Sequence, residues 1–232
     1  RLARDLFEPR AGVLAAGSLL VSAPVWQATV AVNGTPLLMI LALLAFSGWL
    51  RLDSGAERLA PAAALAGWAA LVGSVCGLLF LADYSAGVLV LVALGYGIVR
   101  FSRRAGGWAV LGALTGGFLL IATPWVVRNW NLSGHPVALA RYNVALKQGD
   151  PTAEPAIMRA TLSAVGPEVD LRKLGNKTLT ALRDALQSRL WSGGALWLTA
   201  FFVAGWMYAF RNPVVNRLRW VLAVALAVLV LA

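Results

Sequence analysis

Four polar side chains gather in one stretch of the chain, and their types fit the binding of a phosphate group. Arg128 and Asn129 follow directly after a long apolar run, and Arg141 and Lys147 come further along. An arginine guanidinium binds phosphate oxygens in bidentate fashion, and a lysine supplies a compact point charge. These four residues form a candidate phosphate-binding site.

Each of these residues also has an ordinary structural interpretation. An arginine after an apolar run can extend its side chain to the lipid headgroups, and spacing alone favours that interpretation for Arg128. Arg141 and Lys147 lie in a Gly- and Pro-rich loop, which carries sites more often than chance but is more commonly just solvated. Asp83, at the end of another apolar run, is either part of a polar site or an exposed loop acid.

Familiar catalytic patterns and metal-ligand spacings do not occur in the sequence. Cys76 and His135 are each the single residue of their type, so they predict neither a disulfide nor a zinc cluster. Paired carboxylates, a Ser/His/Asp set and a phosphate-binding glycine loop are also absent. These residues alone therefore predict binding without a defined reaction, and they imply no metal or cofactor.

Membrane helices are the predicted elements that position this site. Of the 232 residues, 59% are hydrophobic and 13% are charged, whereas soluble domains contain roughly 25% charged residues. A soluble globular domain and a disordered chain are both excluded, because so apolar a chain would not stay solvated. Long, evenly apolar runs predict helices, since every backbone polar group must be paired inside lipid. The runs cover residues 11–31, 36–50, 60–81, 86–99, 105–127, 195–210 and 220–232.

The sequence thus predicts an all-α, polytopic transmembrane bundle of about seven spans. We expect five helices within residues 1–127, an extracytoplasmic loop at 128–194, and two helices within 195–232. The chain begins at Arg1 and ends inside an apolar run, so we expect a segment of a longer protein. Several glycines favour close helix packing, although a composition bias explains any single one equally well. They include Gly67, Gly73, Gly77, Gly112, Gly116 and Gly117.

The net charge of +10 indicates orientation in the membrane rather than binding of nucleic acid. Eleven cations flank connections on one side, whereas the short loops at 33–36 and 83–85 carry none. The positive-inside rule places these eleven in the cytoplasm and the 128–194 loop outside. We therefore expect an integral membrane protein with lipids as partners. The eleven are Arg1, Arg4, Arg10, Arg51, Arg58, Arg100, Arg103, Arg104, Arg211, Arg217 and Arg219.

The second half of the long loop has a helical pattern. From Glu168 to Leu190, leucines recur at spacings of three and four, with cations on the other faces. This pattern predicts an amphipathic helix before the sixth span, and Trp191 follows as an interfacial anchor. Contact with lipid and packing on the rest of the loop are equally compatible with it.

Residues 124–129, PWVVRN, followed by GHPV at 134–137, resemble the PWxxRN…GxPV stretch of bacterial GT-C-type membrane glycosyltransferases. These enzymes are related to protein O-mannosyltransferases and lipid A aminoarabinose transferases. Weaker likenesses follow in the same order along residues 1–200, at RDLF (4–7), CGLLFL (76–81), the basic loop 100–104 and the stretch 138–150.

The resemblance implies the transfer of a sugar from a polyprenyl-phosphate donor to an acceptor on the extracytoplasmic face. Arg128, with Arg141 or Lys147, would then stabilise the leaving phosphate, and the catalytic carboxylate would lie upstream of Arg1. The chain departs from the family where a glutamate often opens the next span, because it reads NGTP at 33–36. It also lacks the family's arginine near Asp83.

Two other classes of function stay open from the sequence. One is a transporter or flippase subunit for a lipid-linked or anionic substrate. Such proteins often contain internal repeats and binding residues near the bilayer midplane, and no convincing repeat is visible. The other is a non-catalytic membrane scaffold. The identities of the sugar and the acceptor do not follow from these residues.

Overall fold

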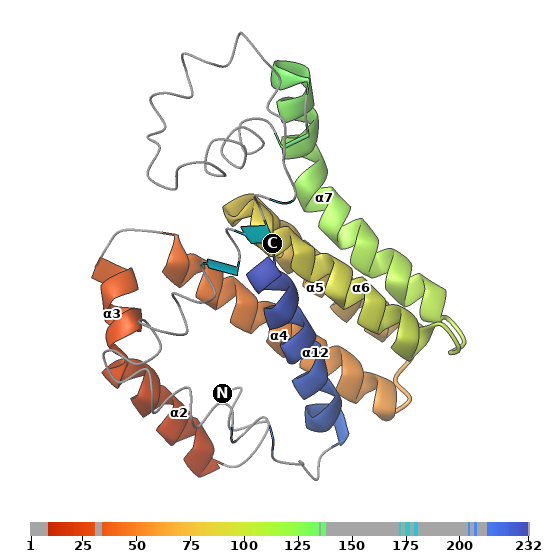
Figure 1. Ribbon diagram of the computed structural model, residues 1–232. Helices are drawn as coiled ribbons and strands as arrows, with labels where there is room; N and C mark the ends of the chain where they lie inside the picture. Colours follow the sequence, from red (N-terminus) through yellow and green to blue (C-terminus); the bar gives the residue numbers. More distant parts are fainter. Residues whose placement is uncertain are drawn as a thin grey trace.

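The computed structural model describes residues 9–30, 34–134, 136–137 and 213–231, with a few single positions between 172 and 207. This part of the chain is helical and contains no strand, so the all-α prediction is confirmed there. Figure 1 shows the elements, which are α2 (Pro9–Val21), α3 (Ala23–Val30), α4 (Thr35–Glu57), α5 (Ala62–Ala82), the 3₁₀ turn η1 (Tyr84–Gly87), α6 (Val88–Phe101), α7 (Gly107–Ser133) and α12 (Pro213–Leu231).

Three helices, α4, α5 and α7, are long and apolar enough to cross a membrane. At 1.5 Å per residue, the 21 residues of α5 span about 30 Å, the thickness of the hydrocarbon core. α6 is a shorter apolar helix of 14 residues. Their length and composition make the chain an integral membrane protein. The predicted span at 195–210 and the helix at 168–190 lie outside the described residues, apart from isolated positions.

The first predicted span, 11–31, is not one continuous helix. It divides at Ser22 into α2, of 13 residues, and α3, of 8 residues. Pro24 explains the break, because proline has no N–H to donate to the carbonyl four residues earlier and its ring clashes with that carbonyl. The Ser22 carbonyl instead accepts the N–H groups of Val25 and Trp26 at 3.1 and 3.2 Å. Neither helix alone is long enough for a straight crossing.

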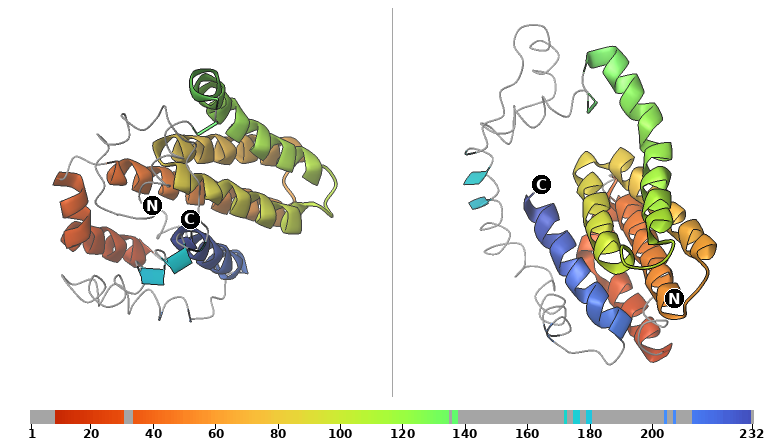
Figure 2. Two further views of the ribbon diagram at one scale, coloured as in Figure 1. Left: turned by 45° about the horizontal axis from the view of Figure 1, so that its top comes forward. Right: turned by 90° about the vertical axis from the view of Figure 1, so that its right-hand side faces the viewer.

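The core lies between α4, α5, α6 and α7, with α12 packed against α4 and α6 (Figure 2). α5 is central, and it contacts α7 along most of its length. Buried side chains of the core include Trp49 and Leu52 of α4, Leu65 of α5, Phe101 of α6 and Leu218 of α12. Dispersion and close packing stabilise such an interface, because lipid removes the hydrophobic driving force between spans.

Many large apolar side chains point away from this core. Leu91 and Val99 of α6 are 64% and 82% exposed, and Leu120 of α7 is 74% exposed. So extensive an apolar surface is unusual on a soluble monomer. It is the surface that a helix presents to lipid tails, which supports the membrane assignment independently of the helix lengths.

Arginines of α6, of the α6–α7 connection and of α12 meet the last turns of α4 at one end of the bundle. Asp53 of α4 is 1% exposed and accepts hydrogen bonds from Arg100 Nε at 2.7 Å and from Arg217 at 2.8 Å. Arg104 donates to the carbonyls of Ala56 and Ala60 at 2.6 and 3.1 Å. We call this the arginine-rich end. Its composition agrees with the sorting of cations to one side that the sequence predicted.

Candidate functional site

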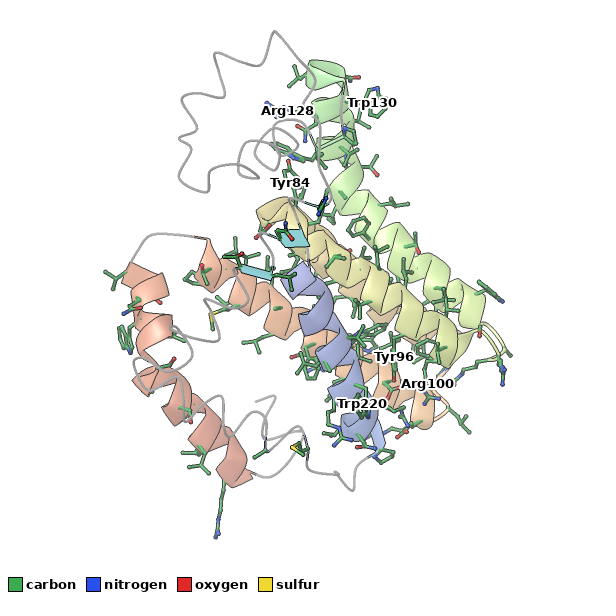
Figure 3. The ribbon with its side chains drawn as sticks, in the orientation of Figure 1. Tyr84, Tyr96, Arg100, Arg128, Trp130 and Trp220 are labelled. Atoms are coloured by element: carbon green, nitrogen blue, oxygen red, sulfur yellow. The ribbon has the colours of Figure 1, made fainter. Side chains whose placement is uncertain are left out.

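The opposite end of the bundle holds the described part of the predicted site. Figure 3 shows Arg128 and Tyr84 at this end, far from Tyr96, Arg100 and Trp220. Arg128 and Asn129 lie on α7, which continues to Ser133, six residues beyond the predicted boundary at 127. They are therefore helical rather than the first residues of a loop.

α7 passes through Pro124, ends at Ser133 and is capped by Gly134. Gly134 has φ of 71°, the left-handed conformation that glycine adopts without a steric cost, and its N–H donates to the Trp130 carbonyl at 2.8 Å. Pro136 and Val137 lie in a turn after it. Arg141 and Lys147 lie outside the described residues, so their place in the site stays a prediction.

Arg128 is exposed, and its guanidinium carbon lies 5.0 Å from the centre of the Trp125 ring. Such a cation–π contact stabilises an exposed arginine by about 0.5–1 kcal/mol. Within the described part of the chain, Arg128 takes part in no ion pair. Its charge is therefore held against an aromatic ring, and no described carboxylate neutralises it.

Trp125, Asn129 and Tyr84 form a hydrogen-bonded group beneath Arg128, which we call the Tyr84 cluster. Trp125 Nε1 donates to the Tyr84 hydroxyl at 2.7 Å, and Asn129 Nδ2 donates to it at 3.4 Å. Asn129 is 4% exposed and also donates to the Pro136 carbonyl at 3.4 Å. The amide that the sequence placed in the binding site thus ties the end of α7 to its neighbours.

Tyr84 is the residue of this end that the sequence analysis missed. It begins η1, the connection between α5 and α6, and its ring lies 5.2 Å from that of Phe80. A tyrosine directly after an apolar run is typical of the aromatic belt at a membrane surface, so a signal was present. Its contact with α7 depends on how the helices pack, and spacing along the chain does not encode that packing.

Asp83 is placed at the same end as Arg128, as the sequence predicted. It ends α5 in an extended conformation, where its N–H donates to the Leu79 carbonyl at 2.8 Å. Its own carbonyl accepts the Ala86 N–H at 3.0 Å. Asp83 is exposed, and its backbone sets the turn that presents Tyr84 to α7.

The hydrogen bond between Trp125 and Tyr84 is expected to couple α7 to the α5–α6 connection. Tyr84→Phe and Trp125→Phe should each lower the free energy of unfolding, and their effects should not add, because both remove the same bond. We expect a coupling free energy of about 0.5–1.5 kcal/mol. Unfolding of the two single variants and the double variant in mixed micelles measures it. Additive effects would contradict the coupling.

No group of three or more His, Cys, Asp or Glu side chains is arranged to hold a metal among the residues that the structure describes. Cys76 lies buried in the core, facing apolar side chains. The chemistry of the described site therefore rests on a guanidinium, two aromatic rings and an amide.

A second polar centre lies at the arginine-rich end. Arg217 donates to both Asp53 and Glu57. Burial lowers the pKa of Arg217, but the hydrogen bonds to these two carboxylates raise it, and the net direction is upward. The guanidinium therefore stays charged across the ordinary pH range. The sequence analysis counted Arg100 and Arg217 as orientation signals and did not identify Asp53 as their shared partner.

Comparisons with known protein families, with curated proteins and with solved structures found no match to this chain.

Proposed function

We propose that this chain is part of an integral membrane glycosyltransferase. The enzyme would move a sugar from a polyprenyl-phosphate donor to an acceptor on the extracytoplasmic face of the bacterial cytoplasmic membrane. The observation that supports the proposal most directly is Arg128. It is an exposed cation at the end of an apolar helix, and it lies against Trp125 within the PWVVRN stretch.

The chemistry of the donor matches that position. A polyprenyl tail lies among the lipid chains, so its phosphate sits where a membrane helix reaches the headgroups. When the sugar leaves, negative charge grows on the phosphate oxygens, and a fixed guanidinium stabilises that charge. Because Trp125 is in turn held by Tyr84, the cluster orients the arginine before the donor arrives. A prearranged cation loses little free energy in reorganisation during the reaction.

The remaining parts of the enzyme are inferred from the sequence. Arg141 and Lys147 would add positive charge beside the phosphate, and the seven-span topology would place all of them outside the cytoplasm. The acceptor hydroxyl needs a base within hydrogen-bond reach, and the family resemblance places that carboxylate upstream of Arg1. The sugar is the group transferred, and no further cofactor is required by these residues.

Arg128→Ala is expected to abolish most of the sugar transfer. Removing one positioned charge-stabilising group costs roughly 100- to 1,000-fold in kcat, and Arg128→Lys should recover part of the rate. The assay uses the complete protein in proteoliposomes. It measures the transfer of labelled mannose or labelled aminoarabinose from the corresponding polyprenyl-phosphate donor.

A matched control is available at the other end of the bundle. Arg103 is an exposed arginine between α6 and α7, so Arg103→Ala removes the same charge without touching the site. Its rate should equal that of the wild type. A wild-type rate in Arg128→Ala would exclude the phosphate role of Arg128. A lack of turnover by the wild type with every polyprenyl-phosphate sugar would exclude the enzyme class.

A further inference from the structure

An apolar groove runs between α6 and α12. Its volume is about 730 Å³, within the range of roughly 300–1,000 Å³ typical of small-molecule sites. The walls come from α6 and α12, and Leu91 and Val99 on one wall are largely exposed. The groove therefore opens toward the lipid. Its apolar lining comprises Val88, Leu91, Val92, Val99, Val221 and Val224.

Three other side chains give this groove a polar end. Tyr96, Arg217 and Trp220 also line it, and Figure 3 shows Tyr96 and Trp220 near Arg100, at the arginine-rich end. The Tyr96 hydroxyl and Arg217 Nε are buried, and neither atom makes a hydrogen bond of good geometry within the described part of the chain. The hydroxyl does lie close to Arg217 and Asp53, and Arg217 binds Asp53 and Glu57 through its other nitrogen, Nη2. Buried polar atoms are seldom left unpaired in proteins. Two hydrogen-bond donors therefore stand beside an apolar channel.

The charge around this end selects the ligand further. Seven described arginines lie there with two acids, Asp53 and Glu57, so the surface is strongly positive. Arg219 lies with its guanidinium carbon 5.4 Å from the centre of the Trp220 ring, which is 57% exposed at the rim. A basic surface of this kind attracts anionic lipid headgroups. The arginines are Arg51, Arg58, Arg100, Arg103, Arg104, Arg217 and Arg219.

We propose that the groove between α6 and α12 binds one anionic phospholipid of the surrounding bilayer. One acyl chain would follow the apolar walls, and the phosphate and ester oxygens would accept hydrogen bonds from Arg217 and Tyr96. The site lies at the opposite end from Arg128, so it does not depend on sugar transfer. The bound lipid would hold α12 against α6 and accept hydrogen bonds from two donor atoms, Tyr96 Oη and Arg217 Nε, that have no partner of good geometry among the described residues.

Gly95→Leu tests the groove without disturbing the core. Gly95 lines the groove, and a Cβ added there meets no atom within 4 Å, so leucine would fill the channel without a clash. Gly112 of α7 has the same open surroundings but does not line the groove, which makes Gly112→Leu the matched control. Native mass spectrometry of the chain in mild detergent, with added phosphatidylglycerol or phosphatidylcholine, counts the retained lipids.

The wild type and Gly112→Leu should each retain one phosphatidylglycerol in preference to phosphatidylcholine. Gly95→Leu should lower that retention on the order of tenfold, and Tyr96→Phe, which removes a single hydroxyl, roughly fivefold. Equal retention of both lipids, or unchanged retention in Gly95→Leu, would overturn the proposal. Two other results with Gly95→Leu would also overturn the proposal if lipid retention stayed unchanged. Lower thermal stability would mean that another segment of the chain fills the groove, and loss of a wild-type dimer would mean that a second copy of the chain fills it.

Discussion

Asp53→Ala is expected to destabilise the bundle by about 3–5 kcal/mol, because it leaves two arginines near a buried site without their shared carboxylate. Asp53 is 1% exposed and binds Arg100 and Arg217, which come from α6 and α12. The variant therefore removes a carboxylate that links α4 to both α6 and α12, while Arg217 keeps its bond to Glu57. The free energy of unfolding, measured by titrating sodium dodecyl sulfate into dodecyl maltoside micelles, gives the loss directly.

Glu57→Ala is the matched control for this experiment. Glu57 lies one helical turn further along α4 and binds Arg217 as well, but its side chain is 34% exposed. Exposed ion pairs contribute only about 0–1 kcal/mol, so this variant should stay near the wild type. If Asp53→Ala cost no more than Glu57→Ala, the buried carboxylate would not hold the helices together.

Gly117→Leu is the second substitution with a large expected effect. A Cβ at Gly117 would overlap the backbone carbonyl of Ala70 and lie 3.1 Å from its Cα, so leucine has to push α7 away from α5. Overpacking of this kind costs about 3 kcal/mol or more, and here the neighbour is rigid backbone rather than a flexible side chain. The same micelle titration should show the loss.

The neighbouring glycine provides the control. Gly116 is exposed, and nothing lies within 4 Å of a Cβ added there. Gly116→Leu should change the free energy of unfolding by only about 0.5 kcal/mol, as surface substitutions usually do. Equal destabilisation by both variants would mean that α5 and α7 do not cross at Gly117.

Gly116 and Gly117 also show which glycine positions the sequence can and cannot assign to a helix contact. Six glycines were candidates for close packing, and a composition bias was an equal alternative for each. Gly73, Gly77 and Gly117 do lie at the α5–α7 crossing, whereas Gly67, Gly112 and Gly116 face open space. A glycine has no side chain whose polarity could reveal its direction. The face that it occupies follows only from how the two helices are rotated against each other.

The candidate site likewise contains features that the sequence predicted and features that only the structure shows. Arg128 and Asn129 could be identified from the sequence, because a cation and an amide directly follow an apolar run. The sequence analysis placed both in one binding role and at the start of a loop. In the structure the two side chains have different surroundings. Asn129 is buried and donates hydrogen bonds to the Tyr84 hydroxyl and the Pro136 carbonyl, whereas Arg128 is exposed on the same helix. Adjacent residues on a helix point about 100° apart, so one can face the fold and the other the surroundings.

Composition and charge order were sufficient to establish apolar helices, the membrane as their solvent and the gathering of arginines at one end. These properties depend on the free energy of transferring each residue from water to lipid, which does not require a particular tertiary structure. The break at Ser22, the pairing of Asp53 with arginines from two other helices and the Tyr84 cluster were decided by tertiary structure. Asp53 and Arg217 are 164 positions apart. Their contact stabilises the protein only once packing has excluded water from between them.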